Sequence, residues 1–446
     1  MLDKSVNLLK GNILKSLIIF SIPLFISNLF QQLYNTVDVM IVGNYLGDVS
    51  LAAIGACAAV YELLVGFALG VGNGFSIVAA RSFGSGNKDL VKKSVAASMV
   101  LGSVIVVIVV IISKFFLYNL LKILNTPANI IDEAYSYISL ITIFVGVMFL
   151  YNLLAGILRA IGNSITPLIF LIISSVLNIF LDIIFIVNFH MGIRGAAVAT
   201  VISQAISSIL CILYIYKKAE ILIPKKEHFK FDKELYKELL GQGLSMGIML
   251  MVVSAGTVIL QSAINNLGYL IIASHTAARK ISSFANMPLI ALSMSLATFV
   301  SQNKGADQGK RIRKAVKYAN IIVAIFGVVA TVLLLFVAPF AVKLLSGSNE
   351  TVVIDNASKY LIINSAFYPV LGVLLNLRNS LQGLGEKMLP LTSSVIEFVG
   401  KILFVIFLIP TLQYFGVIIC EPIIWCIMCI QLIYAFYTHS YIKKVK

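Results

Sequence analysis

The sequence is poor in charged residues, which make up 12% of its 446 residues, and it has one tryptophan, five cysteines and four histidines. Soluble domains usually carry about 25% charged residues, so this composition excludes a water-soluble fold of this length. Apolar residues make up 59%, and the mean hydropathy is +0.98. We therefore expect lipid to surround most of the chain.

The scarcity of cysteine and histidine excludes further classes. All five cysteines lie in or beside apolar runs, and we interpret Cys426 and Cys429 as filling a helix face instead of binding zinc. The four scattered histidines belong to no HExxH motif, and no GxSxG motif is present, which argues against an intramembrane enzyme. The sequence predicts no enzymatic activity, no cofactor and no bound structural metal.

Long uncharged intervals run through the whole chain. A helix needs about 20 apolar residues to cross a hydrocarbon core of about 30 Å, and these continuous runs lack the alternation of a membrane barrel. We predict an all-α integral membrane protein, and we place twelve helices near residues 13–38, 51–80, 94–113, 134–158, 165–188, 195–216, 238–263, 271–300, 316–340, 358–377, 388–410 and 415–438.

The positive charge, 34 Lys and Arg against 19 Asp and Glu, is concentrated on one side of these helices. The two chain ends and every second connection hold 26 of the 34 basic residues. By the positive-inside rule both termini are cytoplasmic, in a multi-pass protein of the plasma (inner) membrane. Because this pattern accounts for the basic excess, we do not expect nucleic-acid binding.

The chain repeats itself when it is shifted by about half its length. Asn44 and Gly47 then meet Asn265 and Gly268, and further on Gly162 and Pro167 meet Gly385 and Pro390. This predicts two six-helix pseudo-symmetric lobes, with an amino-terminal lobe at 1–216, a cytoplasmic linker at 217–237 and a carboxyl-terminal lobe at 238–446. Parallel repeats are typical of alternating-access transporters, whose substrate path lies between the halves.

Two aspartates inside the first-half helices have no acidic counterpart in the second half, where Ile259 and Val405 occupy the equivalent positions. Tyr34, Asn35 and Asp38 share one helix face by their i, i+3 and i+4 spacing, as do Asn178 and Asp182. Two carboxylates at one cavity can hold a proton or a small cation and release it when the cavity opens to water. The alternative is that each aspartate lies near a helix end and is hydrated.

The other ionisable residues within spans leave their partners open. Glu397 and Lys401 have the spacing of an ion pair within one helix, although Glu397 could also face the substrate cavity. Arg279 or Lys280 could pair with Glu397 or Glu62. His275 more often suits a hydrogen-bonded packing role than a proton relay.

Glycine and proline also interrupt the apolar helices. Gly66, Gly70 and Gly74 recur every fourth residue and predict a close-packed helix face. Pro23 removes a backbone hydrogen bond in the first helix, so we expect a bend there.

A series of short segments matches the motifs of one known family, in order and over nearly the whole chain. They are Ile22-Pro23 followed by Leu33–Asp38 and Gly43, Ala80–Gly84, Leu158–Gly162 with Pro167, Asn178–Asp182, Gly195–Thr200 and Phe299–Gly305. The chain thereby resembles the multidrug and toxic compound extrusion (MATE) transporters. The resemblance implies a V-shaped pair of six-helix lobes that exports cationic, amphipathic compounds in exchange for H⁺ or Na⁺.

The resemblance also implies roles for particular residues. The coupling cation would bind at Asp38, Asn178, Asp182 and Thr200, with Na⁺ possible at the two aspartates, and Pro23 would be the hinge of the first helix. Substrate-cavity candidates are Tyr34, Asn35, Tyr137, Asn152 and Glu397. Because Leu239–Ala263 contains no acid, the pattern is DinF-like and not NorM-like, with coupling in the amino-terminal lobe and protons favoured over sodium.

Multidrug efflux by a monomeric antiporter is the resulting prediction, with a lipid-linked oligosaccharide flippase of the same superfamily as the alternative. A flippase would be expected to line its cavity with several basic residues for pyrophosphate. Only Arg279, Lys280 and Lys401 are available within the spans.

Overall fold

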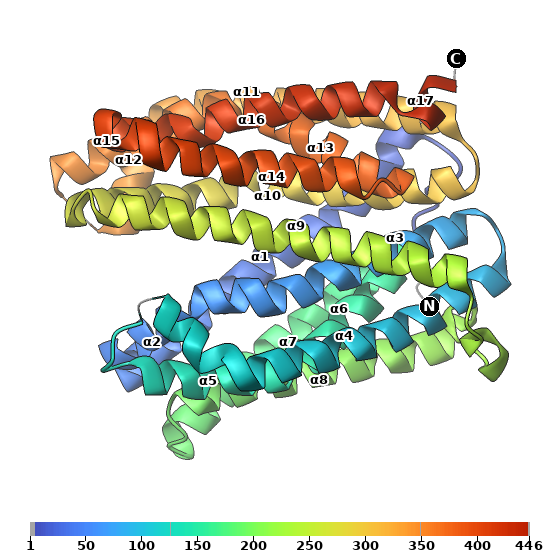
Figure 1. Cartoon of the computed structure of the whole chain (residues 1–446), viewed down its shortest axis with the longest axis horizontal. Coiled ribbons are helices and arrows are strands. Elements are labelled where there is room, and N and C mark those ends of the chain that lie inside the picture. Colours follow the sequence, from blue (N-terminus) through green and yellow to red (C-terminus); the bar gives the residue numbers. More distant parts are fainter. Residues whose placement is uncertain (1–4, 125, 348, 445–446) are drawn as a thin grey trace. The chain divides into compact units, whose positions relative to one another are not determined.

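The computed structural model describes residues 5–444 apart from residues 125 and 348, and within these ranges every regular element is helical (Figure 1). Helices are expected here because a helix satisfies its own backbone hydrogen bonds, which lipid cannot do. The all-helical fold class is confirmed.

The predicted number of spans is confirmed as well. Ten continuous helical segments are long and apolar enough to cross a membrane, and two bent pairs of helices bring the number to twelve if each pair is one span. The continuous segments are Ile13–Leu46, Asp48–Gly84, Lys88–Ile123, Ile165–Asn188, Ile193–Lys218, Lys233–Asn265, Tyr269–Gly305, Gly309–Ser346, Met388–Leu412 and Tyr414–Thr438, and the pairs are Ile131–Ile143 with Val145–Ala160 and Thr351–Ala366 with Tyr368–Leu384.

Two compact units divide the chain. The first unit comprises the segment up to Leu9 and Ile22–Met251, and the second comprises Lys10–Ser21 and the residues from Val252 onward. Both α1 (Ile13–Leu46) and α9 (Lys233–Asn265) contribute to both units. The two units are defined by how compactly their residues pack. The predicted boundaries 1–216, 217–237 and 238–446 are defined by the sequence repeat instead, and they stay a prediction.

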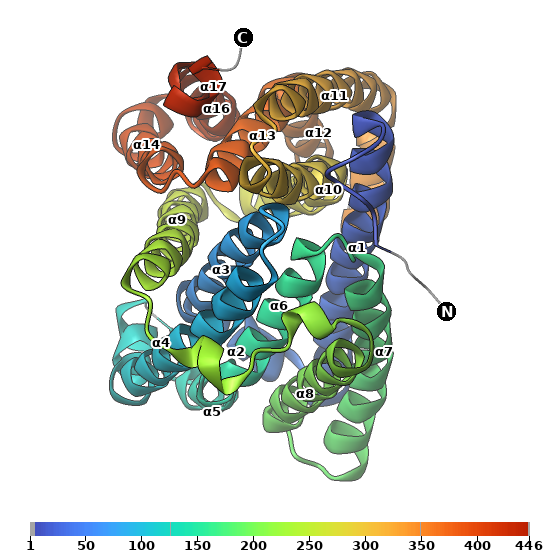
Figure 2. The same cartoon turned by 90° about the vertical axis from the view of Figure 1, so that its right-hand side faces the viewer.

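The first unit is a bundle in which α3 packs against α4 and α6, and α8 packs against α5, α6 and α7 (Figure 2). Its helices are α2 (Asp48–Tyr61), the π-helical turn η1 (Glu62–Gly66), α3 (Phe67–Gly84), α4 (Lys88–Ile123), α5 (Ile131–Ile143), α6 (Val145–Ala160), α7 (Ile165–Ile183), the π-helical turn η2 (Ile184–Asn188), α8 (Ile193–Lys218), and the short 3₁₀ turns η3 (Glu220–Leu222) and η4 (Lys226–Phe229).

Glycines let α3 and α9 approach closely within the first unit. A Cβ atom on Gly70 would lie 2.8 Å from the Cα of Gly247, and one on Gly74 would lie 2.6 Å from the Cα of Gly243. Only a residue without a side chain fits at such separations. The predicted close-packed glycine face is therefore confirmed for Gly70 and Gly74.

The second unit is built around α10, which packs against α11, α12 and α13. Figure 1 shows α14 and α16 running side by side in this unit. Its helices are α10 (Tyr269–Gly305), α11 (Gly309–Ser346), α12 (Thr351–Ala366), α13 (Tyr368–Leu384), α14 (Met388–Leu403), the π-helical turn η5 (Phe404–Leu408), α15 (Ile409–Leu412), α16 (Tyr414–Thr438) and α17 (Ser440–Lys444).

Backbone irregularities recur at equivalent positions of the sequence repeat. The bent spans break at Phe144, by 48°, and at Phe367, by 54°, and these two residues are related by the same shift that places Gly162 on Gly385. The same shift relates His190 to Gln413, which have positive φ angles of 52° and 53° although neither is glycine. The two halves therefore share local geometry as well as sequence.

Candidate functional site

A buried pair of carboxyl groups forms the centre of the candidate site in the first unit. Asp38 on α1 is 8% exposed and Asp182 on α7 is 0% exposed, and the two carboxyl groups interact directly with each other. Neither Asp182 oxygen, nor Oδ1 of Asp38, has a hydrogen-bond partner among the described residues. Two buried acceptors in contact need a donor between them, and a proton or a cation would supply it.

A narrow polar gap, too small to hold a water molecule, lies beside this pair. It contains no charged side chain and is lined by Tyr34, Ser174, Ser175, Asn178, Thr200, Ser203 and Gln204. Asn178 is 1% exposed, and both polar atoms of its amide are without a partner among the described residues. Drug-sized ligands occupy about 300–1,000 Å³, so a gap this narrow holds no such ligand in this conformation.

Several predicted residues come together here. Tyr34 lies against Thr200 and near both carboxyl groups, and Tyr137 lies near Asp38 and Tyr34. The structure thus gathers the predicted coupling residues and two of the cavity candidates around one site.

Two other candidates are not brought to the carboxyl pair by any described contact. Asn35 is exposed on α1. The side-chain amide of Asn152 donates to the carbonyl of Met148 on its own helix, at 2.9 Å. Their roles in a substrate cavity stay predictions.

Charged residues in the second unit are paired instead. Nη1 of Arg279 on α10 lies 2.9 Å from both carboxylate oxygens of Glu421 on α16, and the Tyr360 hydroxyl donates to the same carboxylate at 3.1 Å. Arg279 therefore pairs with Glu421, and its two predicted partners, Glu397 and Glu62, are wrong. Sequence reasoning missed Glu421, although an acid within the predicted span 415–438 is the same signal that singled out Asp38 and Asp182.

A second ion-paired group joins α14 to α13. Nζ of Lys401 donates to Oε1 of Glu397 at 2.9 Å, which confirms the predicted pair within one helix. Nη2 of Arg378 lies 3.7 Å from the other Glu397 oxygen. The sequence analysis counted Arg378 among the residues of a cytoplasmic connection, but the structure buries it in α13 with 8% exposure.

Three remaining predictions concern single residues. His275 is buried between Tyr360 and Tyr414, with ring-to-ring distances of 5.2 and 6.1 Å, which fits its predicted packing role. Lys280 is exposed. Pro23 lies inside α1, one residue after the point at which that helix passes from the second unit to the first, so its role as a hinge stays a prediction.

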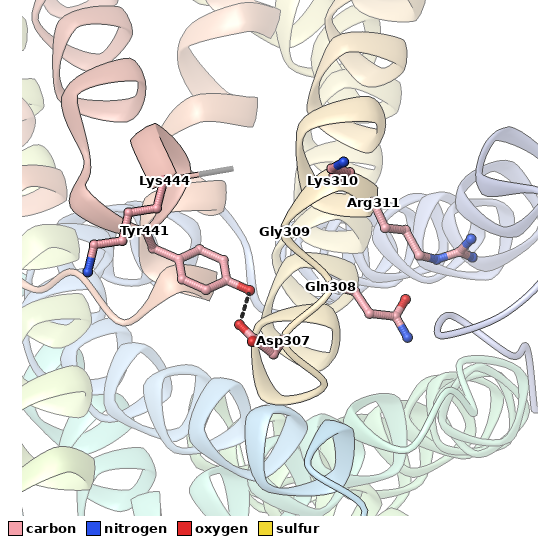
Figure 3. A pocket seen from close by; sticks show the side chains of 7 residues that line it. All are labelled: Asp307, Gln308, Gly309, Lys310, Arg311, Tyr441 and Lys444. Atoms are coloured by element: carbon pink, nitrogen blue, oxygen red, sulfur yellow. Dashed lines mark hydrogen bonds between the residues drawn. The ribbon is translucent and has the colours of Figure 1, made fainter. Parts of the chain in front are cut away.

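A shallow basic pocket of about 890 Å³ lies in the second unit where α10 turns into α11 (Figure 3). The Tyr441 hydroxyl donates to Asp307 at 2.9 Å, and burial together with this carboxylate raises the pKa of Tyr441 to about 12. In Figure 3 the side chains of Lys310, Arg311 and Lys444 point away from one another. The pocket therefore lacks converging groups for a ligand.

These features together define a class of protein. Ten apolar helical segments, or twelve with the two bent pairs, are long enough to cross a membrane, and the first half holds a buried acidic pair that lacks a donor among the residues the structure describes. Among the described residues no group of three or more His, Cys, Asp or Glu side chains could hold a metal ion. This is the architecture of a multi-pass membrane transporter.

Comparison with known proteins identifies the family. The MatE family model matches the chain twice, at residues 23–184 and 246–407, and the chain therefore belongs to the MatE family. The two matched ranges are related by the shift that also relates Phe144 to Phe367. Members of this family are transporters and not enzymes.

Similar proteins span the whole chain. A curated relative, the "Probable multidrug resistance protein YoeA" of Bacillus subtilis, is 27% identical over 98% of this chain and 96% of its own length. Crystal structures described as MATE in the bent and in the straight conformation superpose with TM-scores of 0.90 and 0.89 at 24% identity, and each match covers 100% of this chain and 99% or 100% of the other. These structures show that the fold is the same.

Proposed function

We propose that this chain is a secondary active multidrug efflux antiporter, which exports cationic amphipathic compounds in exchange for H⁺ or Na⁺ by alternating access. The observation that carries the proposal is the buried contact between Asp38 and Asp182 without a hydrogen-bond donor. The membership of the MatE family and the name of the Bacillus subtilis relative support export of drugs.

The coupling ion binds between the two carboxyl groups in this mechanism. With the ion bound, the pair carries less negative charge and tolerates burial; without it, the pair favours a state in which water reaches the cavity. Asn178 and Thr200 line the cavity on the side of α7 and α8 and offer polar atoms to the ion. Coupling follows because the site is stable when closed only with its ion bound.

The first helix transmits this change in the proposed mechanism. Asp38 lies about four helical turns after Pro23 on the same helix. The charge at Asp38 therefore acts on a segment that already lacks one backbone hydrogen bond. The position of Pro23, where α1 passes from one compact unit to the other, supports a hinge at this residue.

Coupling in the amino-terminal half, as in the DinF-like pattern, agrees with the arrangement of charge. The second-unit acids Glu397 and Glu421 already have basic partners, whereas the aspartate pair has none. The same ion pairs argue against the flippase alternative, since Arg279 and Lys401 are neutralised and unavailable for a pyrophosphate group.

The proposed protein works as a monomer in the plasma (inner) membrane with both termini in the cytoplasm. The support is the placement of 25 of the 34 basic residues at the chain ends and alternate connections, once the buried Arg378 is left out of the 26.

Transport in proteoliposomes tests the proposal. Ethidium flux is measured with an imposed pH gradient, with an imposed sodium gradient and with neither, for the wild type and for Asp38→Asn and Asp182→Asn. We expect one gradient to drive flux in the wild type, and each variant to lose at least about 90% of that flux, since the titrating charge is gone while the side-chain volume is kept.

Asp48→Asn is the matched control, because it removes an exposed acid at the start of α2 and should keep wild-type flux. Gradient-driven flux at the wild-type rate in both Asp38→Asn and Asp182→Asn would overturn the coupling assignment. The gradient that drives the wild type decides between protons and sodium.

A further inference from the structure

One acid in the first unit, Glu62, belongs to neither the carboxyl pair nor an ion pair. It lies in the continuous helical span Asp48–Gly84, whose middle residue is Gly66. One turn of helix, about 5 to 6 Å, separates Glu62 from that middle residue, so Glu62 sits at the depth of the hydrocarbon core. An ionisable side chain at that depth is costly unless it faces water, a partner or a ligand.

Exposure distinguishes Glu62 from Asp38, Asp182, Glu397 and Glu421. Its side chain is exposed, whereas Asp38 and Asp182 are buried. Glu397 and Glu421 are held by basic residues, but no hydrogen bond or ion pair joins Glu62 to a basic group within the described part of the chain. Its negative charge is therefore open to a positively charged group from outside.

The helix face around Glu62 does not have the character of a lipid-facing surface. Its exposed neighbours on that face, one and two turns earlier, are Ala58 and Gly55, and a Cβ on Gly55 would meet nothing within 4 Å. The exposed face of α11, in contrast, carries large apolar side chains, as a lipid-facing surface does. Among them are Val328, Val332 and Phe336, which are 57%, 50% and 81% exposed. Small side chains beside an acid leave room for a bulky ligand.

The local backbone also sets Glu62 apart. It begins the π-helical turn η1, and such turns are rare and frequently occur at functional sites. The equivalent part of the second half, near Ser283 in α10, is regular α-helix. Tyr61, the preceding residue, lies near both Glu62 and Tyr34. An aromatic ring next to a carboxylate is a favourable environment for an organic cation.

We infer that Glu62 binds the positively charged group of the transported compound, with Tyr61 beside it, as a site separate from the ion-coupling pair. This inference rests on the proposed function, because it requires a cationic substrate. It assigns the two tasks of an antiporter to different acids of one unit: Asp38 and Asp182 hold the coupling ion, and Glu62 holds the substrate's charge.

Ethidium binding to the purified protein in detergent, followed by fluorescence anisotropy, tests this division. We expect Glu62→Gln to weaken ethidium binding, raising the Kd by about tenfold or more, because the cation loses its charge partner. Glu62→Asp keeps the charge and should stay within about threefold of the wild type. Asp48→Asn, the same charge change on the same helical span, should leave the Kd unchanged.

The coupling variant separates this inference from the proposed function. Asp38→Asn should bind ethidium with nearly the wild-type Kd while losing gradient-driven flux, and Glu62→Gln should still lose flux when ethidium is limiting but regain it at high ethidium concentration. An unchanged Kd in Glu62→Gln, with a wild-type elution profile, overturns the inference alone. Absence of ethidium binding and flux in the wild type overturns the proposed function and the inference with it.

Discussion

The two units treat buried acids in opposite ways. In the first unit the Asp38 and Asp182 carboxyl groups face each other without a donor, whereas in the second unit Glu397 and Glu421 are each 2.9 Å from a basic group. A paired acid already has a counter-charge within the protein, so it does not need to bind and release an ion. An unpaired acid is satisfied only when something binds, and that dependence is what a coupled transporter needs.

Glycine contacts and ion pairs hold helices together in both units. Within the first unit, glycines of α3 and α9 allow backbone contact, as at Gly74 and Gly243. Within the second unit, ion pairs link α10 to α16 and α14 to α13. Each unit also uses the other kind of contact. Arg81 of α3 lies 2.6 Å from Glu238 of α9 in the first unit, and a Cβ on Gly383 would lie 2.8 Å from the Ala297 carbonyl oxygen in the second.

Neutralising one acid of the first unit is expected to have the largest effect on activity. It should not lower the stability of the protein. Asp182→Asn should lose gradient-driven flux but unfold at a temperature no lower than the wild type, because the substitution gives the pair a donor. Thermal unfolding followed by size-exclusion chromatography measures this. A clear fall in the unfolding temperature would mean that Asp182 has a stabilising partner.

Neutralising a paired acid of the second unit should lower stability and leave ion coupling intact. Glu397→Gln leaves Lys401, whose side chain is 2% exposed, and Arg378, at 9%, without their counter-charge. Breaking a buried pair in this way costs about 3 to 5 kcal/mol, so we expect a marked fall in unfolding temperature.

Ion coupling should persist in whatever Glu397→Gln protein remains folded. The double variant Glu397→Gln with Lys401→Met should lose less stability than Glu397→Gln alone, since only one buried cation stays unpaired. A raised KM for ethidium at unchanged stability would instead favour Glu397 as part of the substrate cavity.

The smallest effect concerns the glycine contacts of the first unit. Gly74→Ala places a Cβ 2.6 Å from the Cα of Gly243 and must push α3 and α9 apart, at a cost of about 1 to 3 kcal/mol. Gly55→Ala is the matched control, because its Cβ meets open space. Equal unfolding temperatures for the two variants would show that the close approach does not stabilise the unit.

Much of the fold could be predicted because its signals are local. Apolar runs of span length predict twelve helices, and repeated Gly and Asn residues at one offset predict the duplication, which the double match to the MatE family model bears out. Asp38 and Asp182 could be singled out because acids in apolar spans are rare and each helix places them with polar neighbours on one face.

The pairing of charges could not be predicted in the same way. Arg279 and Glu421 are 142 residues apart, and only the fold brings them together, because α12 and α13 pack against both α10 and α16. Arg378 follows an apolar run and precedes a polar one, so the sequence places it equally well inside or outside the membrane. The π-helical turn at Glu62 is likewise a local adjustment without a residue signature.

The π-helical turns η2 and η5 occur in corresponding spans of the two halves. They begin at Ile184 and Phe404, which lie at nearly equivalent positions of the repeat, near the end of corresponding spans in the two halves. A widened turn present in both copies is most simply inherited from a single six-helix ancestor. Asp182 lies just before this turn in one copy, and Val405 stands at the equivalent position in the other. The widened turn therefore does not depend on the acid, because both copies have the turn and only one has the carboxyl group.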